Sequence, residues 1–228
     1  MNEEQLLPPV GFRQRGPVPT GSRLLMIRHG ESRANAVGVA GGPIGDGGLT
    51  QRGQAQARAL ASRLAASQEL HGATALYCSD LPRARETAHI ISSGLREGLE
   101  LQEEPGIAEI SVGEGDGLTW PEFVARFGAV NWDEDPTALN APGGESLVGF
   151  HSRSVVALEK LIKRHPHEQI VLVTHGGFIE QVLKYLWGVR AGERLMPRIE
   201  NCSMTEVEFG VDRNRLLRYN DLAPLPAS

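Results

Sequence analysis

Two histidines in this chain each follow a short apolar segment that is typical of a buried β-strand. Arg28-His29-Gly30-Glu31 comes directly after Leu24–Ile27, and His175 comes directly after Ile170–Thr174. Apolar parallel strands are buried on both faces, and the side chains at their carboxyl ends meet along one edge of the sheet. We therefore expect the two imidazoles to lie together, with Arg28 beside them as a partner for an anion.

A further arginine, Arg83, follows another apolar strand candidate at residues 74–79. Two guanidinium groups, together with helices expected to begin near Gly30 and Gly176, would bind a phosphate dianion. A neutral His29 could then attack phosphorus and form a phosphohistidine. Arg28, Arg83 and a protonated His175 would stabilise the charge that spreads over the equatorial oxygens.

Such a transfer needs a proton for the leaving alkoxide, and Glu109 is the candidate donor. It follows a short strand candidate at residues 99–103, and its apolar neighbours Ile107 and Ile110 could raise its pKa. The same carboxylate could then activate the water molecule that releases phosphate. On local sequence alone, an ordinary loop carboxylate is the alternative interpretation, and Glu114 or Asp116 would then be the candidate donor.

Strand and helix patterns alternate along the chain, which predicts an α/β fold. We expect a three-layer αβα sandwich with a mostly parallel central sheet and an antiparallel C-terminal strand supplied by a closing hairpin. Residues 1–22, which contain four prolines and three glycines, are expected to form an irregular or disordered leader, and residues 23–228 a single catalytic domain. The expected strands are 23–28, 74–79, 99–103, 170–174, 203–209 and 215–219, and the expected helices are 50–66, 80–93, 121–127, 145–164 and 176–187.

Two of these helices carry more specific predictions. Ser79 or Asp80 is expected to cap the helix that contains Arg83, with Pro82 in its first turn. In the long helix 145–164, Arg153, Lys160 and Lys163 are expected to face solvent.

The amino-acid composition argues against several classes of function for this chain. The chain has 228 residues and a formal net charge of −5, which argues against a broad nucleic-acid or membrane-surface role. No apolar segment reaches transmembrane length, and the two cysteines, Cys78 and Cys202, are too few for a disulfide framework or a thiolate metal site. We expect a cytoplasmic protein with reduced cysteines, without a metal and without a cofactor.

Taken together, the motifs resemble those of the histidine phosphatase superfamily, which includes the cofactor-dependent phosphoglycerate mutases and many phosphatases. The resemblance covers residues 23 to about 210, with five motifs in the expected order. These are Arg28–Ser32 with Asn35, Leu49–Ala57, Ser79–Ala88, Pro142–Ser146 and Val173–Gly177. The ordered set is far more specific than a single Arg-His-Gly. The resemblance implies that His29 accepts the phosphate, that Arg28, Arg83 and His175 form the phosphate pocket, that Glu109 donates the proton and that Asn35 lines the pocket.

The segment 110–141 favours hydrolysis over mutase activity. Mutases of this family carry extra basic residues after the catalytic glutamate, whereas this segment contains six acidic residues and one basic residue, Arg126. An acidic segment repels a doubly phosphorylated ligand and favours a neutral or cationic leaving group. We predict a metal-independent histidine phosphatase that hydrolyses a small phosphorylated metabolite, such as that of a sugar, nucleoside or amino alcohol. A phosphoglycerate mutase-type phosphotransferase and a non-catalytic phospho-ligand binding module are the alternatives, and a homodimer is possible.

Overall fold

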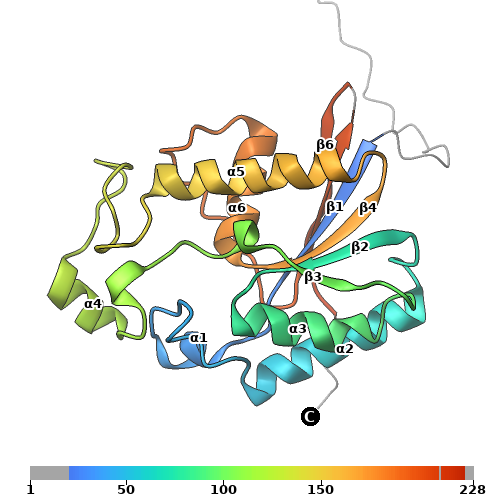
Figure 1. The fold of residues 1–228 in the computed structure, drawn as a ribbon, viewed down its shortest axis with the longest axis horizontal. Coiled ribbons are helices and arrows are strands. Elements are labelled where there is room, and N and C mark those ends of the chain that lie inside the picture. The colour runs from blue at the N-terminus through green and yellow to red at the C-terminus, as the bar shows by residue number, and fades with distance from the viewer. Residues whose placement is uncertain (1–20, 211, 224–228) are drawn as a thin grey trace, which may run out of the picture.

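A six-stranded sheet runs through the centre of the computed structural model, which describes residues 21–210 and 212–223. The strand order is β3-β2-β4-β1-β5-β6 (Figure 1). The first four strands in this order are parallel, and β5 and β6 pair antiparallel, β5 with β1 and β6 with β5. The strands are β1 (Gly21–Arg28), β2 (Ala73–Cys78), β3 (Leu101–Glu103), β4 (Gln169–Thr174), β5 (Met204–Gly210) and β6 (Asn214–Asp221).

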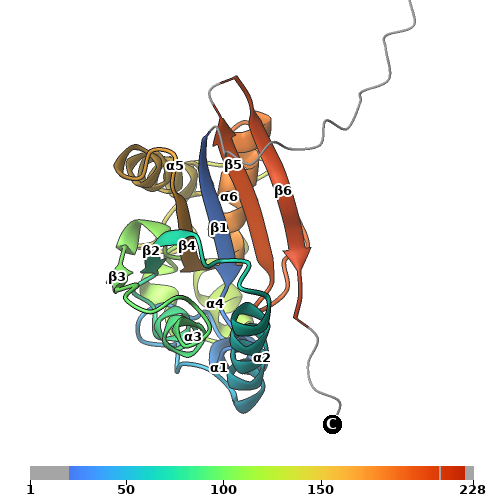
Figure 2. The same ribbon diagram turned by 90° about the vertical axis from the view of Figure 1, so that its right-hand side faces the viewer.

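Helices cover both faces of this sheet, so the predicted three-layer α/β architecture is confirmed (Figure 2). The predicted antiparallel C-terminal hairpin is also present, as β5 and β6. The helices are α1 (Arg33–Val37), α2 (Gln51–Ser67), α3 (Pro82–Ser92), α4 (Trp120–Phe127), α5 (Leu147–Arg164) and α6 (Gly176–Trp187), with short 3-10 turns η1 (Pro105–Ile107) and η2 (Gly113–Gly115).

The side chains of β1 point alternately to the two faces of the sheet, which explains why helices cover both faces. Leu24 and Met26 pack in the apolar cluster that contains α5 and α6, whereas Leu25 and Ile27 pack in the cluster that contains α2 and α3. All four side chains are fully buried. Because successive side chains of a strand point to opposite faces, one continuous apolar sequence serves two cores.

The structure corrects several predicted boundaries. β1 begins at Gly21, two residues before the predicted start, and the rest of the predicted leader lies outside the described residues. The predicted helix start near Gly30 is wrong, because Ser32 caps α1 and the helix begins at Arg33. The predicted caps of α3 are also wrong, because its N-cap is Leu81, which makes no side-chain cap hydrogen bond.

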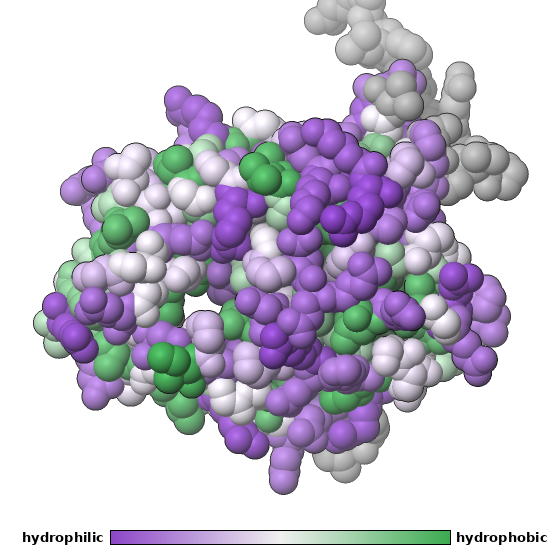
Figure 3. Space-filling model, in the orientation of Figure 1, coloured by the Kyte–Doolittle hydropathy of each residue, from purple (hydrophilic) through white to green (hydrophobic). Residues whose placement is uncertain are grey.

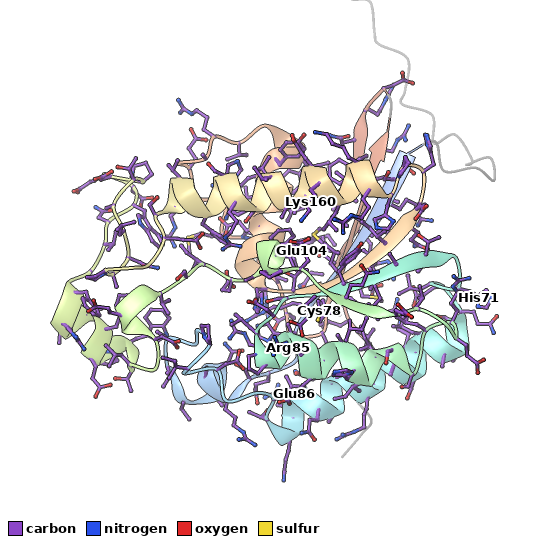
Figure 4. All side chains as sticks on the ribbon, viewed as in Figure 1. His71, Cys78, Arg85, Glu86, Glu104 and Lys160 are labelled. Atoms are coloured by element: carbon purple, nitrogen blue, oxygen red, sulfur yellow. The ribbon has the colours of Figure 1, made fainter. Side chains whose placement is uncertain are left out.

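Salt bridges and hydrogen bonds attach the segment between β3 and residue 110 to α5. Glu104 accepts a hydrogen bond from the backbone N–H of Gly106, and its other oxygen lies 3.2 Å from Nζ of Lys160 on α5 (Figure 4). Lys160 and Lys163 are exposed as predicted, but Arg153 is not. The Arg153 side chain is only 28% exposed, because it folds back to bind Glu145 and the carbonyls of Gly106, Ala108 and Glu109. The segment that carries Glu109 is therefore held in place by α5.

None of the helices in the described residues is both long and apolar enough to cross a membrane.

Candidate active site

The carboxyl ends of β1 and β4 bring the two predicted histidines together. The strands pair in parallel with Arg28 opposite Thr174, and the backbone N–H of His29 donates to the carbonyl of Thr174 at 2.9 Å. His29 and His175, the residues that directly follow the two strands, therefore lie at the same level of the sheet. The ring centroids of His29 and His175 are 5.0 Å apart, and both rings are buried.

The hydrogen bonds of His29 define which ring nitrogen is available for chemistry. Its Nδ1 lies 2.7 Å from the carbonyl oxygen of Gly30, so Nδ1 carries the proton and donates it to that carbonyl. Nε2 then carries the lone pair, which faces Arg83. Burial, reinforced by the charges of Arg83 and Arg28, holds the pKa of His29 well below 6.5. The ring is therefore neutral near pH 7, as a nucleophile must be.

His175 is held in the complementary tautomer. Its Nε2 lies 2.8 Å from Oγ of Ser79, and its Nδ1 accepts a hydrogen bond from Nε of Arg83 at 3.3 Å. With Nδ1 as the acceptor, Nε2 is the protonated nitrogen and donates to Ser79. Burial and the charge of Arg83 hold the pKa of His175 well below 6.5. A dianion bound between the rings would favour protonation at Nδ1, because an opposite charge stabilises the imidazolium.

Arg83 joins the two histidines. Its Nε also donates to Nε2 of His29 at 3.1 Å, so one guanidinium contacts both rings. Its Nη1 is held at 2.5 Å from Asp46 and at 2.9 Å from the carbonyl of Gly41. Asp46 is fully buried and also accepts hydrogen bonds from the backbone N–H groups of Gly48 and Arg83. The carboxylate therefore connects the glycine-rich loop to the start of α3 and orients the guanidinium.

Arg28 supplies a second positive charge at the end of β1. Its Nη1 donates to the carbonyl of Ile199, and its Nε is buried without a hydrogen-bond partner among the described residues. Burial lowers the pKa of Arg28 from its usual value. A buried N–H without a partner carries a free-energy penalty that an anion would remove, which fits a phosphate-binding role.

Glu109 lies at the first turn of α6. One carboxylate oxygen accepts the backbone N–H of Gly177 at 3.1 Å, and the other accepts the N–H of Ile110 at 3.0 Å. A Cβ at residue 177 would lie 2.0 Å from a Glu109 oxygen, so only glycine permits this close approach. The structure thus places Glu109 next to the helix that begins immediately after His175.

Asn35 has a different local environment. Its side chain is exposed, and its amide oxygen accepts the backbone N–H of Ser32 at 3.3 Å, while Ser32 Oγ accepts the N–H of Asn35. This reciprocal pair is the capping box of α1. The structure thus gives Asn35 a capping role, and among the described residues its side chain makes no hydrogen bond to His29, Arg83 or His175.

Three residues that support the site were not identified from the sequence as members of it. Asp46 orients Arg83, Ser79 binds His175, and the amide of Asn201 donates to the backbone carbonyl of His29 at 2.9 Å. In the sequence, Asp46 is recognisable only as an acidic residue within a glycine-rich loop, and Ser79 and Asn201 only as polar residues near the ends of apolar strands. These patterns do not predict which site residue each of the three contacts.

Comparison with known proteins agrees with this geometry. The model of the histidine phosphatase superfamily (branch 1) matches residues 24–222. A metal-independent phosphoserine phosphatase of Arabidopsis thaliana is 32% identical over 84% of this chain and 80% of its own length. Phosphoglycerate mutase-like protein 4 of the same plant is 32% identical over 90% and 87%.

A solved structure shows the same fold. A mycobacterial glucosyl-3-phosphoglycerate phosphatase superposes with a TM-score of 0.72 at 28% identity, over 87% of this chain and 99% of that one. The predicted fold, family and phosphatase class are thereby confirmed. The chain belongs to the histidine phosphatase superfamily, branch 1.

Proposed function

We propose that this protein hydrolyses small phosphorylated metabolites through a phosphohistidine formed on Nε2 of His29. The observation that carries the proposal is the contact of one guanidinium, that of Arg83, with the facing nitrogens of both buried imidazoles. These groups can surround a tetrahedral dianion with one nucleophile and several donors.

The first step transfers the phosphoryl group to the protein. The lone pair on His29 Nε2 attacks phosphorus, the N–P bond forms and the ester P–O bond breaks. A protonated Glu109 gives its proton to the leaving alkoxide, so the product is a neutral alcohol. Arg28, Arg83 and His175, the last protonated in the presence of the dianion, stabilise the charge on the three equatorial oxygens.

The second step releases phosphate. The Glu109 carboxylate, now ionised, takes a proton from a water molecule whose oxygen attacks phosphorus. The N–P bond breaks, and its electron pair returns to Nε2 of His29. The carbonyl of Gly30 keeps Nδ1 protonated throughout, which keeps the nucleophilic nitrogen aimed at phosphorus.

Hydrolysis is favoured over a mutase reaction by the charges after Glu109. Arg126, the one basic residue in segment 110–141, lies on α4, where its guanidinium is 3.6 Å from Glu114. Its charge is therefore offset by a neighbour. A mutase must retain a second phosphate while the first is on histidine, and this segment supplies no unpaired cation in the described residues for that task.

The test measures phosphate release from p-nitrophenyl phosphate in the presence of EDTA. We expect turnover by the wild type and none by His29→Ala, because the nucleophile is absent. The control is His71→Ala, an exposed histidine that precedes the amino end of β2 (Figure 4) and should retain activity, because the site lies at the carboxyl ends of the strands. Acid-sensitive labelling of wild-type histidine with radioactive phosphate should be lost in His29→Ala. Interconversion of 3- and 2-phosphoglycerate that outpaces phosphate release would contradict the proposal.

A further inference from the structure

A cavity of about 280 Å³ adjoins the proposed phosphate pocket on the Glu109 side. Gly41, whose carbonyl binds Arg83, lies on its wall together with Glu109. Figure 3 shows an opening on this face of the molecule, between the segment that leads to α4 and the loop that follows α1. A leaving group that is protonated by Glu109 would occupy this space.

The cavity is lined by more acidic than basic side chains. Arg153 is the only basic one among the lining residues, and four are acidic. The acidic lining residues are Asp80, Glu109, Asp116 and Glu145.

Arg153 is not free to bind a substrate. Its Nε and Nη2 bind the two oxygens of Glu145 at 2.7 Å each, its Nη1 binds the carbonyls of Gly106 and Ala108, and its Nη2 also binds the carbonyl of Glu109. A guanidinium has five N–H donors, and these contacts use all five. A substrate carboxylate in this cavity would therefore meet acidic side chains without a free cation.

The acidic residues of the cavity differ in the groups that balance their negative charge. Glu145 is paired with Arg153, and Asp116 accepts the backbone N–H groups of Gly42, Ile44 and Gly45. Asp80 is partly buried, accepts a long hydrogen bond from Oγ of Ser79 at 3.5 Å and forms no salt bridge within residues 21–210 and 212–223. Its basic neighbour Arg85 is instead paired with Glu103 at 2.8 Å.

We propose that the preferred substrate is the phosphate monoester of an amino alcohol, with an ammonium group and no carboxylate on the leaving group. The ammonium would lie in the cavity near Asp80, whose carboxylate forms no salt bridge among the described residues and is therefore available to a positive charge. The inference rests on the proposed hydrolysis at His29 and specifies its substrate class.

Three phosphate esters test the charge requirement with the full-length protein. O-phosphoethanolamine carries an ammonium, L-phosphoserine adds a carboxylate to the same skeleton, and 2-hydroxyethyl phosphate replaces the ammonium by a hydroxyl. We expect kcat/KM for phosphoethanolamine to exceed that for phosphoserine by at least about tenfold, because like charges without a partner are strongly disfavoured. We expect an excess of about twofold to fivefold over 2-hydroxyethyl phosphate, the range of a partly exposed ion pair.

A charge-neutral variant assigns the preference to one side chain. Asp80→Asn should reduce the ratio of phosphoethanolamine to 2-hydroxyethyl phosphate towards one. The control Asp133→Asn makes the same change at an exposed residue outside the cavity lining and should keep the wild-type ratio. The ratio compares two substrates on one protein sample, so a partial loss of folded protein does not affect it.

The possible outcomes distinguish failure of the substrate-class inference from failure of the proposed hydrolase function. Equal or faster turnover of phosphoserine, or an unchanged ratio in Asp80→Asn, would overturn the substrate class while leaving the hydrolase intact. Absence of phosphate release from all three esters and from p-nitrophenyl phosphate would overturn both.

Discussion

Replacing Asp46 by Asn would test whether this buried carboxylate orients the guanidinium of Arg83 for the proposed phosphoryl transfer. The substitution preserves shape, and the remaining oxygen can still accept the N–H groups of Gly48 and Arg83. The other oxygen becomes an NH₂ group that faces Nη1 of Arg83 at 2.5 Å, where two donors repel each other. The guanidinium must therefore turn, and the turn displaces Nε from between His29 and His175.

The magnitudes follow from the burial of both partners. Side-chain exposure is 6% for Arg83 and 0% for Asp46, and removal of one partner of such a pair costs about 3–5 kcal/mol in the free energy of unfolding. Hydrogen bonds that the retained amide makes reduce the cost, so we expect a loss near the lower limit. Displacement of one transition-state donor lowers kcat by about 10²–10³-fold.

The assay combines phosphate release, inhibition by inorganic phosphate and urea unfolding. Asp46→Asn should show reduced kcat, weaker phosphate inhibition and reduced stability. The control is Glu69→Gln, which disrupts the ion pairs with Arg63 and Arg218 before the amino end of β2 and should reduce stability without changing kcat. A folded Asp46→Asn protein with kcat and phosphate inhibition within threefold of wild type would refute the positioning role.

Two further predictions concern Glu109 and the two buried histidines. Glu109→Gln should lower kcat by about 10²–10⁴-fold for an alkyl ester. The effect should be smaller for p-nitrophenyl phosphate, whose leaving group needs no proton. Equal kcat values for wild type and variant would contradict this role and make Glu114 or Asp116 the candidate donor. Stability should fall as pH is lowered from 7 to 5, because His29 and His175 have lowered pKa values in the folded protein while the unfolded chain takes up protons below about pH 6.5. Each histidine contributes up to about 2 kcal/mol to this loss, and urea unfolding of a His29→Asn/His175→Asn double variant should show a shallower pH dependence. An unchanged dependence in that variant would contradict the assignment.

The positions of the six strands along the chain were predictable to within one or two residues, because apolar segments followed by polar motifs are typical of buried strands. The order of the strands in the sheet was not predicted. His29 and His175 directly follow the carboxyl ends of β1 and β4, and Arg83 lies in the first turn of α3, the helix after β2, so local sequence was sufficient to place them. The supporting contacts were not predictable in this way. Asp46 lies in a loop without periodicity, and Asn201 contacts a backbone carbonyl 172 residues away.

Arg153 shows why helical spacing alone was insufficient. Its position in the helical pattern of α5 predicts a side chain that faces solvent. A long arginine side chain can nevertheless fold along its helix, and here carbonyl groups of η1 and of the two residues after it supply the partners. Which loop packs against a helix depends on tertiary structure, and that information is absent from a periodicity pattern.

The pairing of β1 with β4 has a consequence for protein synthesis. β4 lies between β1 and β2 in the sheet, although the ribosome makes it long after both. Until β4 has emerged, the backbone N–H and C=O groups along the facing edges of β1 and β2 are unpaired, and these apolar strands are available to chaperones or to other nascent chains. The enzyme can therefore gain activity only after most of its chain has been translated, and co-translational folding cannot yield an active N-terminal fragment.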